Sequence, residues 1–208
     1  REALAILHGK YFGNMKQYTL TQIQNAMRIK GYKFFENGDY NLNIIGIRNV
    51  SDTVDNLFDD TMFLAYKVDG RFCTIQFPMT TQPGAYYMKN PMNRLGAAIL
   101  VPGQYSGVYQ IGLHQGKYEA LVQRGALKVY RDMDRDLQYD YQNISDSIGD
   151  GINIHKAGRA STKIDNWSAG CQVLAYSADF DVMMGLAKRS KTLYGDKFTY
   201  TLLLSTDI

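Results

Sequence analysis

Residues 62–77 read Met62-Phe63-Leu64-Ala65-Tyr66-Lys67-Val68-Asp69-Gly70-Arg71-Phe72-Cys73-Thr74-Ile75-Gln76-Phe77. Two runs rich in apolar and aromatic residues flank Asp69-Gly70, a dipeptide that favours a tight two-residue turn. The stretch therefore predicts a β-hairpin with strands at 62–68 and 71–77. In the second strand, Cys73 shares one face with Ile75 and Phe77, which predicts a buried structural thiol.

Strands are expected through most of the remaining chain, because short apolar runs alternate with polar or Gly-containing turns. They are expected at 42–48, 97–101, 107–111, 126–131, 151–155, 171–174 and 198–204. The acidic, Ser- and Asn-rich stretch 132–150 is expected to be a loop. The chain is therefore predicted to be mainly β.

One helix is expected near each end of the chain. Thr19-Leu20-Thr21-Gln22 has the capping-box pattern, and Gly31 provides a stop. The later helix is expected to be capped by Ser177, to end before Gly195, and to bury a face made of Phe180, Met183, Met184 and Ala187. These elements divide the chain into an N-terminal helical segment, 1–38, and a main domain, 39–208.

Composition excludes several classes of protein. The 208 residues are 45% apolar and carry a formal net charge of +3, with no dense basic run, so nucleic-acid binding is not expected. No apolar run is long enough for a membrane span, and residues 1–8 are too short and too soon interrupted for a signal peptide. Two cysteines are too few for a disulfide scaffold, although Cys73 and Cys171 have the option of pairing.

The segment that carries chemistry runs from Gly151 to Leu174. His155 ends an apolar strand, and sixteen positions later Cys171 begins another, after the small turn Ser168-Ala169-Gly170. The thiolate is the nucleophilic form of cysteine, and an imidazole can take the thiol proton and deliver it to a leaving amine. A lone Cys is usually a core residue and a lone His a satisfied polar one, but a merely buried Cys needs no such turn, which adds weight to a catalytic Cys171–His155 pair. In a working pair the pKa of the thiol is expected to be depressed.

His155, the sixteen-position step and Ser168-x-Gly170-Cys171 resemble the signature of the L,D-transpeptidases of the YkuD type, a His followed at similar distance by Ser/Thr-His-Gly-Cys. Residues 77–86 and 102–105 are similar to that family's Thr-Pro-x-Gly-x-Phe region. The variant Asn166-Trp167-Ser168-Ala169-Gly170-Cys171-Gln172-Val173 is similar to a bacteriophage branch associated with cell-wall degradation. The resemblance spans about residues 40–176.

The resemblance implies an L,D-transpeptidase-like β-sandwich and a catalytic role for residues 39–208. Cys171 would be the nucleophile, His155 its base, and the N–H groups of Gly170 and Cys171 the oxyanion donors. Ser168 belongs to the same turn. The family's His two places before the cysteine is Ala169 here, which favours a hydrolase over a transpeptidase. No cofactor is expected.

The implied substrate is the stem peptide of bacterial peptidoglycan. The protein would be a phage endolysin released at lysis or a virion-associated enzyme with other virion proteins as partners. The alternatives are an L,D-transpeptidase and a non-catalytic wall-binding or virion structural module, in which Cys171 would keep an ordinary pKa near 8.5.

Several residues have two interpretations. His114 is either a second site histidine, in place of the one lost at Ala169, or a surface turn residue. Trp167 either walls a substrate groove or anchors its loop. The group that orients His155 is a main-chain carbonyl, Asp165 or Asn166.

Metal sites are not expected. The three His and two Cys lack the paired spacing of a zinc site. Asp132-x-Asp134-x-Asp136, with Asp140 beyond, has the odd-position carboxylates of a calcium loop. However, Leu137 stands where the sharp-turn Gly is required, and no Glu closes the twelfth position. A solvated acidic turn is the default interpretation.

Overall fold

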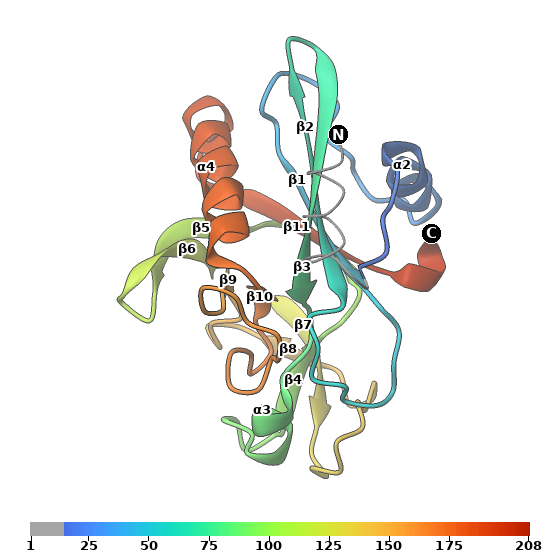
Figure 1. Ribbon diagram of the computed structural model, residues 1–208, viewed down its shortest axis with the longest axis vertical. Coiled ribbons are helices and arrows are strands. Elements are labelled where there is room, and N and C mark those ends of the chain that lie inside the picture. The colour runs from blue at the N-terminus through green and yellow to red at the C-terminus, as the bar shows by residue number, and fades with distance from the viewer. Residues whose placement is uncertain (1–14) are drawn as a thin grey trace.

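The computed structural model describes residues 15–208, whose main feature is an eight-stranded sheet that closes into a barrel (Figure 1). Around the barrel the strands follow the order β1-β11-β5-β6-β9-β10-β3-β2. They are β1 (Asn43–Arg48), β2 (Asp60–Val68), β3 (Arg71–Thr80), β5 (Gly103–His114), β6 (Tyr118–Gln123), β9 (Ile154–Lys156), β10 (Gln172–Leu174) and β11 (Phe198–Leu204). The chain is mainly β, as predicted.

The barrel replaces the expected sandwich because β11 connects two parts of the sheet. It pairs in parallel with β1 on one side and antiparallel with β5 on the other, so the sheet has no open edge there. A second parallel pair joins β9 to β10. Both parallel pairs bring together strands from different parts of the chain, which local patterns do not reveal.

The predicted hairpin is present as β2 and β3. Val68 pairs with Arg71, and Asp69 and Gly70 have φ values of 49° and 73°, the left-handed conformation that this turn requires. The Asp39 carboxylate accepts hydrogen bonds from both turn N–H groups, at 2.8 and 3.0 Å. The residues of this turn therefore fix the register in which β2 pairs with β3.

A smaller sheet of order β4-β7-β8 lies at one end of the barrel, near the short helix α3 (Ala85–Lys89) (Figure 1). Its strands are β4 (Ala97–Leu100), β7 (Leu127–Asp132) and β8 (Ser145–Ser147). Three of these elements had no prediction: α3, β6, and β8 within the expected loop. In addition, β5 is longer than expected and extends to His114.

Helix α2 (Leu20–Ile29) has the predicted capping box. The Gln22 N–H donates to the Thr19 hydroxyl at 3.3 Å, and the Gln22 side chain accepts from the Thr19 N–H at 2.9 Å. The later helix, α4 (Ser177–Tyr194), ends at Gly195 as expected, but its N-cap is Tyr176. Ser177 was therefore wrong as the cap, because the main chain is already helical there.

The strands β1, β2 and β11 are buried on both faces. One face contributes Ile44 and Leu202 to a core that includes α4, and the other contributes Ile45, Phe63 and Leu203 to a cluster under α2. Burying each such side chain stabilises the fold by about 1.5–3 kcal/mol. The described part of the predicted 1–38 segment is thus packed onto the barrel. Its remainder, 1–14, and the signal-peptide prediction at 1–8 lie outside the described residues.

Both cysteines are free, so the alternative disulfide is not formed. Cys73 is partly exposed near the start of β3, where the prediction of a buried thiol was wrong because burial begins only further along the strand, at Phe77. Within residues 15–208, no helix has the length and apolarity needed to cross a membrane.

Candidate active site

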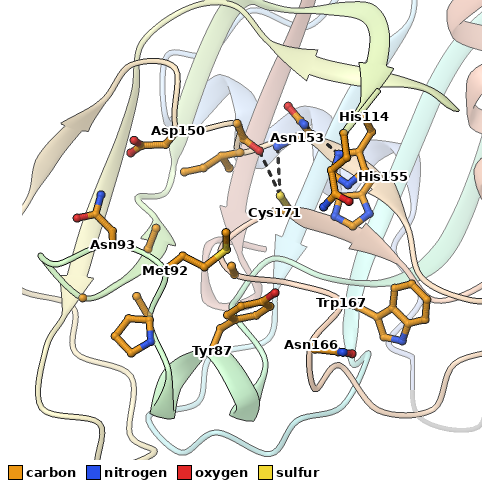
Figure 2. A pocket seen from close by; sticks show the side chains of 18 of the residues that line it. Tyr87, Met92, Asn93, His114, Asp150, Asn153, His155, Asn166, Trp167 and Cys171 are labelled. Carbon is orange, nitrogen blue, oxygen red and sulfur yellow. Dashed lines mark hydrogen bonds between the residues drawn. The ribbon is translucent and has the colours of Figure 1, made fainter. Parts of the chain in front are cut away.

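A cavity of about 510 Å³ opens where the barrel meets the smaller sheet (Figure 2). Four of the predicted site residues line it: His114, Trp167, His155 and Cys171. The wall also includes Asn166, one of the candidates for orienting His155, and Ala169. Its other residues had no predicted role, namely Tyr87, Pro91, Met92, Asn93, Gly96, Ala97, Ala98, Gln115, Arg131, Asp150, Gly151, Ile152 and Asn153. The chain therefore brings the predicted nucleophile and base into one hollow.

Parallel pairing of β9 with β10 brings Cys171, which precedes β10, close to Asn153, which precedes β9 and stands two positions before His155. Val173 is the register partner of His155, and the Gln172 N–H donates to the Asn153 carbonyl at 2.9 Å. Side chains two positions apart share a face of a strand, so Asn153 and Cys171 lie on the face of His155. The sixteen-residue step is thus the connection between two adjacent strands.

The Cys171 sulfur is held by two main-chain groups, shown as dashed lines in Figure 2. It accepts from the Asn153 N–H at 3.4 Å and donates to the Gly151 carbonyl at 3.4 Å, so neither partner is His155. Although Cys171 keeps partial exposure, burial raises the pKa of its thiol to about 11. The resting site therefore holds a neutral thiol, opposite to the depressed pKa expected of a working site.

His155 is 4% exposed, and its orientation is fixed by the main chain. Its Nδ1 lies 2.9 Å from the Lys156 carbonyl oxygen, which can only accept, so Nδ1 carries the proton and Nε2 is free to accept one. The orienting group is thus a carbonyl rather than Asp165 or Asn166. Burial, with a smaller contribution from His114, lowers the pKa of His155 to about 4. At neutral pH His155 is an uncharged base.

His114 stacks on the His155 ring, with centroids 4.1 Å apart and an interplanar angle of 20°. The Asn153 amide donates to His114 Nδ1 at 3.0 Å, while its oxygen accepts from the Gln123 N–H at 2.9 Å. His114 therefore carries its proton on Nε2. Burial is the main cause that lowers its pKa. Of its two interpretations, the structure excludes the surface turn residue, because His114 is 7% exposed.

Ser168 and Gly170 shape the turn before Cys171 and do not line the cavity. The fully buried Ser168 hydroxyl donates to the Cys171 carbonyl at 2.8 Å and accepts from the Gly170 N–H at 3.2 Å. The Gly170 N–H is therefore occupied, so the prediction of Gly170 and Ser168 as oxyanion or substrate-binding groups is corrected to positioning roles. The Cys171 N–H stays the predicted oxyanion donor.

Only glycine fits at position 170. Its φ is +128°, and an added Cβ would lie 2.6 Å from the Ala98 carbonyl oxygen of β4. The turn is also tied to the segment 77–86, because the Gly84 N–H donates to the Ser168 carbonyl at 2.9 Å. Segment 77–86 and the turn before Cys171 are thus in direct contact.

The remaining walls of the cavity are mixed in character. Trp167 lines the cavity and is 42% exposed, which agrees with its interpretation as a wall of a groove. Tyr87 of α3 and Met92 of the following loop also line the cavity (Figure 2). On another side, Arg131 pairs with Asp150 at 2.7 Å. Asn153 stands two residues before His155, so the two-residue period of a strand could have indicated that it shares the face of His155. No local signal in the sequence indicated Tyr87, Met92, Arg131 or Asp150.

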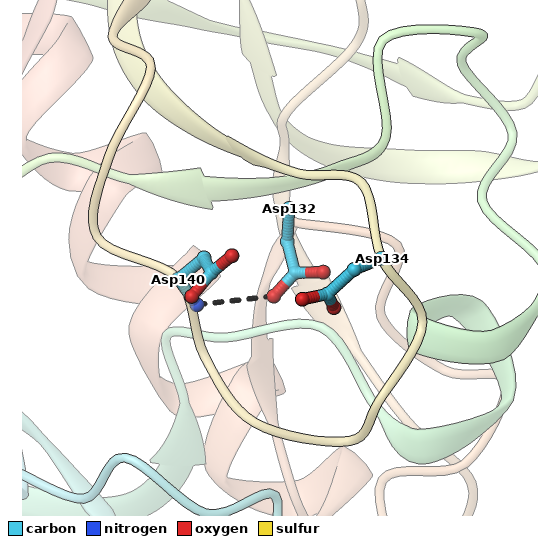
Figure 3. Close-up of side chains that lie close together, drawn as sticks. All are labelled: Asp132, Asp134 and Asp140. Atoms are coloured by element: carbon cyan, nitrogen blue, oxygen red, sulfur yellow. Dashed lines mark hydrogen bonds between the residues drawn. The ribbon is translucent and has the colours of Figure 1, made fainter.

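Comparison of the chain with protein-family models, with curated proteins and with solved structures finds no match. Among the described residues, one group of acidic, His or Cys side chains is close enough to share a metal ion. It comprises Asp132, Asp134 and Asp140, which lie outside the cavity (Figure 3). The titratable and nucleophilic side chains that line the cavity include the Cys171 thiol and the imidazoles of His114 and His155.

Proposed function

We propose that the protein is a cysteine-dependent enzyme that cleaves amide bonds in peptidoglycan stem peptides through an acyl-enzyme on Cys171. The observation that carries this proposal is the placement of Cys171 and His155 on one face of two paired strands, in the wall of a cavity. His155 is a neutral base there, with Nδ1 tied to a carbonyl and Nε2 free to accept a proton. A neutral imidazole with a free nitrogen is the form of histidine that can take a proton from a nucleophile.

The neutral resting state determines the order of events. As Sγ attacks the substrate carbonyl carbon, the thiol proton moves to His155 Nε2, because no thiolate exists beforehand. The C–N bond then breaks, and His155 returns the proton to the leaving amine. Water attacks the resulting thioester, again giving a proton to His155, and the carboxylate product leaves with Cys171 restored as a thiol. Before attack, the S–H must turn from the Gly151 carbonyl towards His155.

The cavity suits a short peptide. Its volume of about 510 Å³ lies within the usual range for small-ligand sites. Tyr87, Met92 and Trp167 offer apolar contacts, and Asn93 and Asn166 offer amides. Hydrolysis is favoured over transpeptidation because Ala169 replaces a site histidine of the resembled family. In this proposal the scaffold is a relative of the L,D-transpeptidase fold, and the protein acts on the bacterial wall at phage lysis or from the virion.

A second candidate is a non-catalytic wall-binding or virion module. The raised pKa of Cys171 and the two main-chain hydrogen bonds of its sulfur favour this candidate, because a retired nucleophile needs no activation. It retains the cavity as a peptide-binding site. Both candidates bind the peptide in the cavity, but only the enzyme cleaves it.

The test is digestion of purified peptidoglycan by the full chain, with soluble fragments identified by mass spectrometry. Cys171→Ala should release no fragments, and His155→Gln should be about 10²–10⁴-fold slower. Cys73→Ala is the matched control and should equal the wild type, because Cys73 does not line the cavity. Binding without fragments supports the non-catalytic module, and undiminished cleavage by Cys171→Ala contradicts the enzymatic proposal.

A further inference from the structure

Three carboxylates converge where β7 ends and the loop towards β8 begins. One oxygen each of Asp132, Asp134 and Asp140 lies within 4.8 Å of the others, and the carboxylates of Asp132 and Asp134 point towards one another (Figure 3). The sequence favours a solvated acidic turn at this place, since the calcium-loop pattern is incomplete. The burial of Asp132 argues against that interpretation.

Asp132 is only 1% exposed, although it is an ionisable residue next to two others. Its Oδ2 accepts a hydrogen bond from the Asp140 N–H at 3.0 Å, but its buried Oδ1 has no partner in the structure. Such an orphaned oxygen is unfavourable unless a cation or a donor satisfies it. Burial raises the pKa of Asp132 and the nearby carboxylates add to this rise, although the hydrogen bond from the Asp140 N–H opposes it.

We propose that Asp132, Asp134 and Asp140 bind a calcium ion. All three offer oxygen, the donor that hard cations prefer, and no nitrogen or sulfur ligand belongs to the group. Calcium accepts six to eight oxygens in flexible geometry, so water and loop carbonyls can complete the shell. Magnesium requires a near-ideal octahedron, for which a loop with one buried and two more exposed carboxylates is poorly suited.

The proposed ligands differ from those that a linear calcium-loop motif would select. Asp136 stands at an odd position of the pattern, but its carboxylate is used within the loop. Its Oδ1 accepts from the Gln138 N–H at 2.7 Å, and its Oδ2 accepts from the Gln138 amide at 3.2 Å. Asp136 is therefore excluded from the site, and it provides a matched control in the same loop.

The site has a structural role beside the cavity. Asp132 pairs with Ala97 of β4, and both Ala97 and Arg131 line the cavity. An added Cβ at Gly96 would lie 1.9 Å from the Asp132 carbonyl oxygen, so the two segments are in close contact. A bound cation would relieve the repulsion between the carboxylates and hold the start of the β7–β8 loop against this wall. This inference does not depend on the proposed enzymatic activity.

The experiment is thermal unfolding of the full chain after chelation, with calcium chloride added to a saturating concentration. At about 100 times the dissociation constant, the melting temperature should rise by roughly 5–10 °C. Asp134→Asn and Asp140→Asn should lose most of this rise, whereas Asp136→Asn should keep it. Asp132→Asn should abolish the rise and, without calcium, should melt no lower than the wild type, because it removes a buried charge.

Two results would overturn the proposal. The first is an unchanged melting temperature up to about 10 mM calcium, a concentration above the range of known calcium modules. The second is a rise that Asp134→Asn and Asp140→Asn both retain. An equal rise with magnesium at the same concentration would overturn the choice of calcium. Because the readout is stability, none of these results depends on whether peptidoglycan is cleaved.

Discussion

The buried imidazole of His155 makes stability depend on pH in a definite direction. Burial and the neighbouring His114 lower the pKa of His155 from its ordinary 6.5 to about 4. Between these values the unfolded chain binds a proton at this position and the folded protein does not. Stability is therefore complete above about pH 6.5 and is lost as the pH falls towards 4. At 1.36 kcal/mol per pKa unit, the loss due to His155 is about 3 kcal/mol at about pH 4.

Urea unfolding of the wild type and His155→Gln, at about pH 7.5 and about pH 4, measures this quantity. Carboxylates titrate in the same range but are present in both proteins, so the difference between the two free energies of unfolding isolates His155. From neutral to acid pH this difference should shift by about 3 kcal/mol in favour of the variant. Parallel pH profiles, within about 0.5 kcal/mol, would refute a buried neutral His155.

Two substitutions and one pH profile test other features of the structure. Gly170→Ala should lower the free energy of unfolding by about 2–4 kcal/mol in denaturant titrations, because of its positive φ and its clash with β4. Asp60→Ala should lower it by about 2–5 kcal/mol by the same measurement, because the N–H groups of Asn49 and Thr81 lose the buried carboxylate to which they donate at 2.7 and 2.6 Å. If the protein is an enzyme, kcat/KM should stay constant as the pH is lowered to about 5, although an ordinary histidine would already be protonated there. A decline in kcat/KM centred near pH 6.5 would contradict the low pKa of His155.

The parts of the fold that depend on neighbouring residues were predictable from the sequence. The capping box at Thr19 and the turn at Asp69-Gly70 specify α2 and the β2–β3 hairpin through contacts within a few residues. Barrel closure was not predictable, because it depends on β1 pairing with β11, more than 150 positions away along the chain. No local pattern encodes such a pairing.

The candidate site shows the same division. The pattern around Cys171 pointed to the thiol and the turn, and the parallel pairing of β9 with β10 brings Cys171 and His155 into the wall of one cavity. The roles of Ser168 and Gly170 were misjudged because their hydrogen bonds close the turn on itself. Asn153, which orients His114 and donates to the Cys171 sulfur, was missed, since its importance depends on β9 and β10 being neighbours.

Trapping the acyl-enzyme tests the central proposal most directly. The full chain would be mixed with stem peptides, quenched in acid within seconds, and analysed by mass spectrometry of the intact protein and of the peptide that contains Cys171. An acyl adduct is expected on Cys171; it should be absent from Cys171→Ala and should decay as hydrolysed product appears. Product formation without any adduct on Cys171, at equal rate in Cys171→Ala, would contradict the proposal.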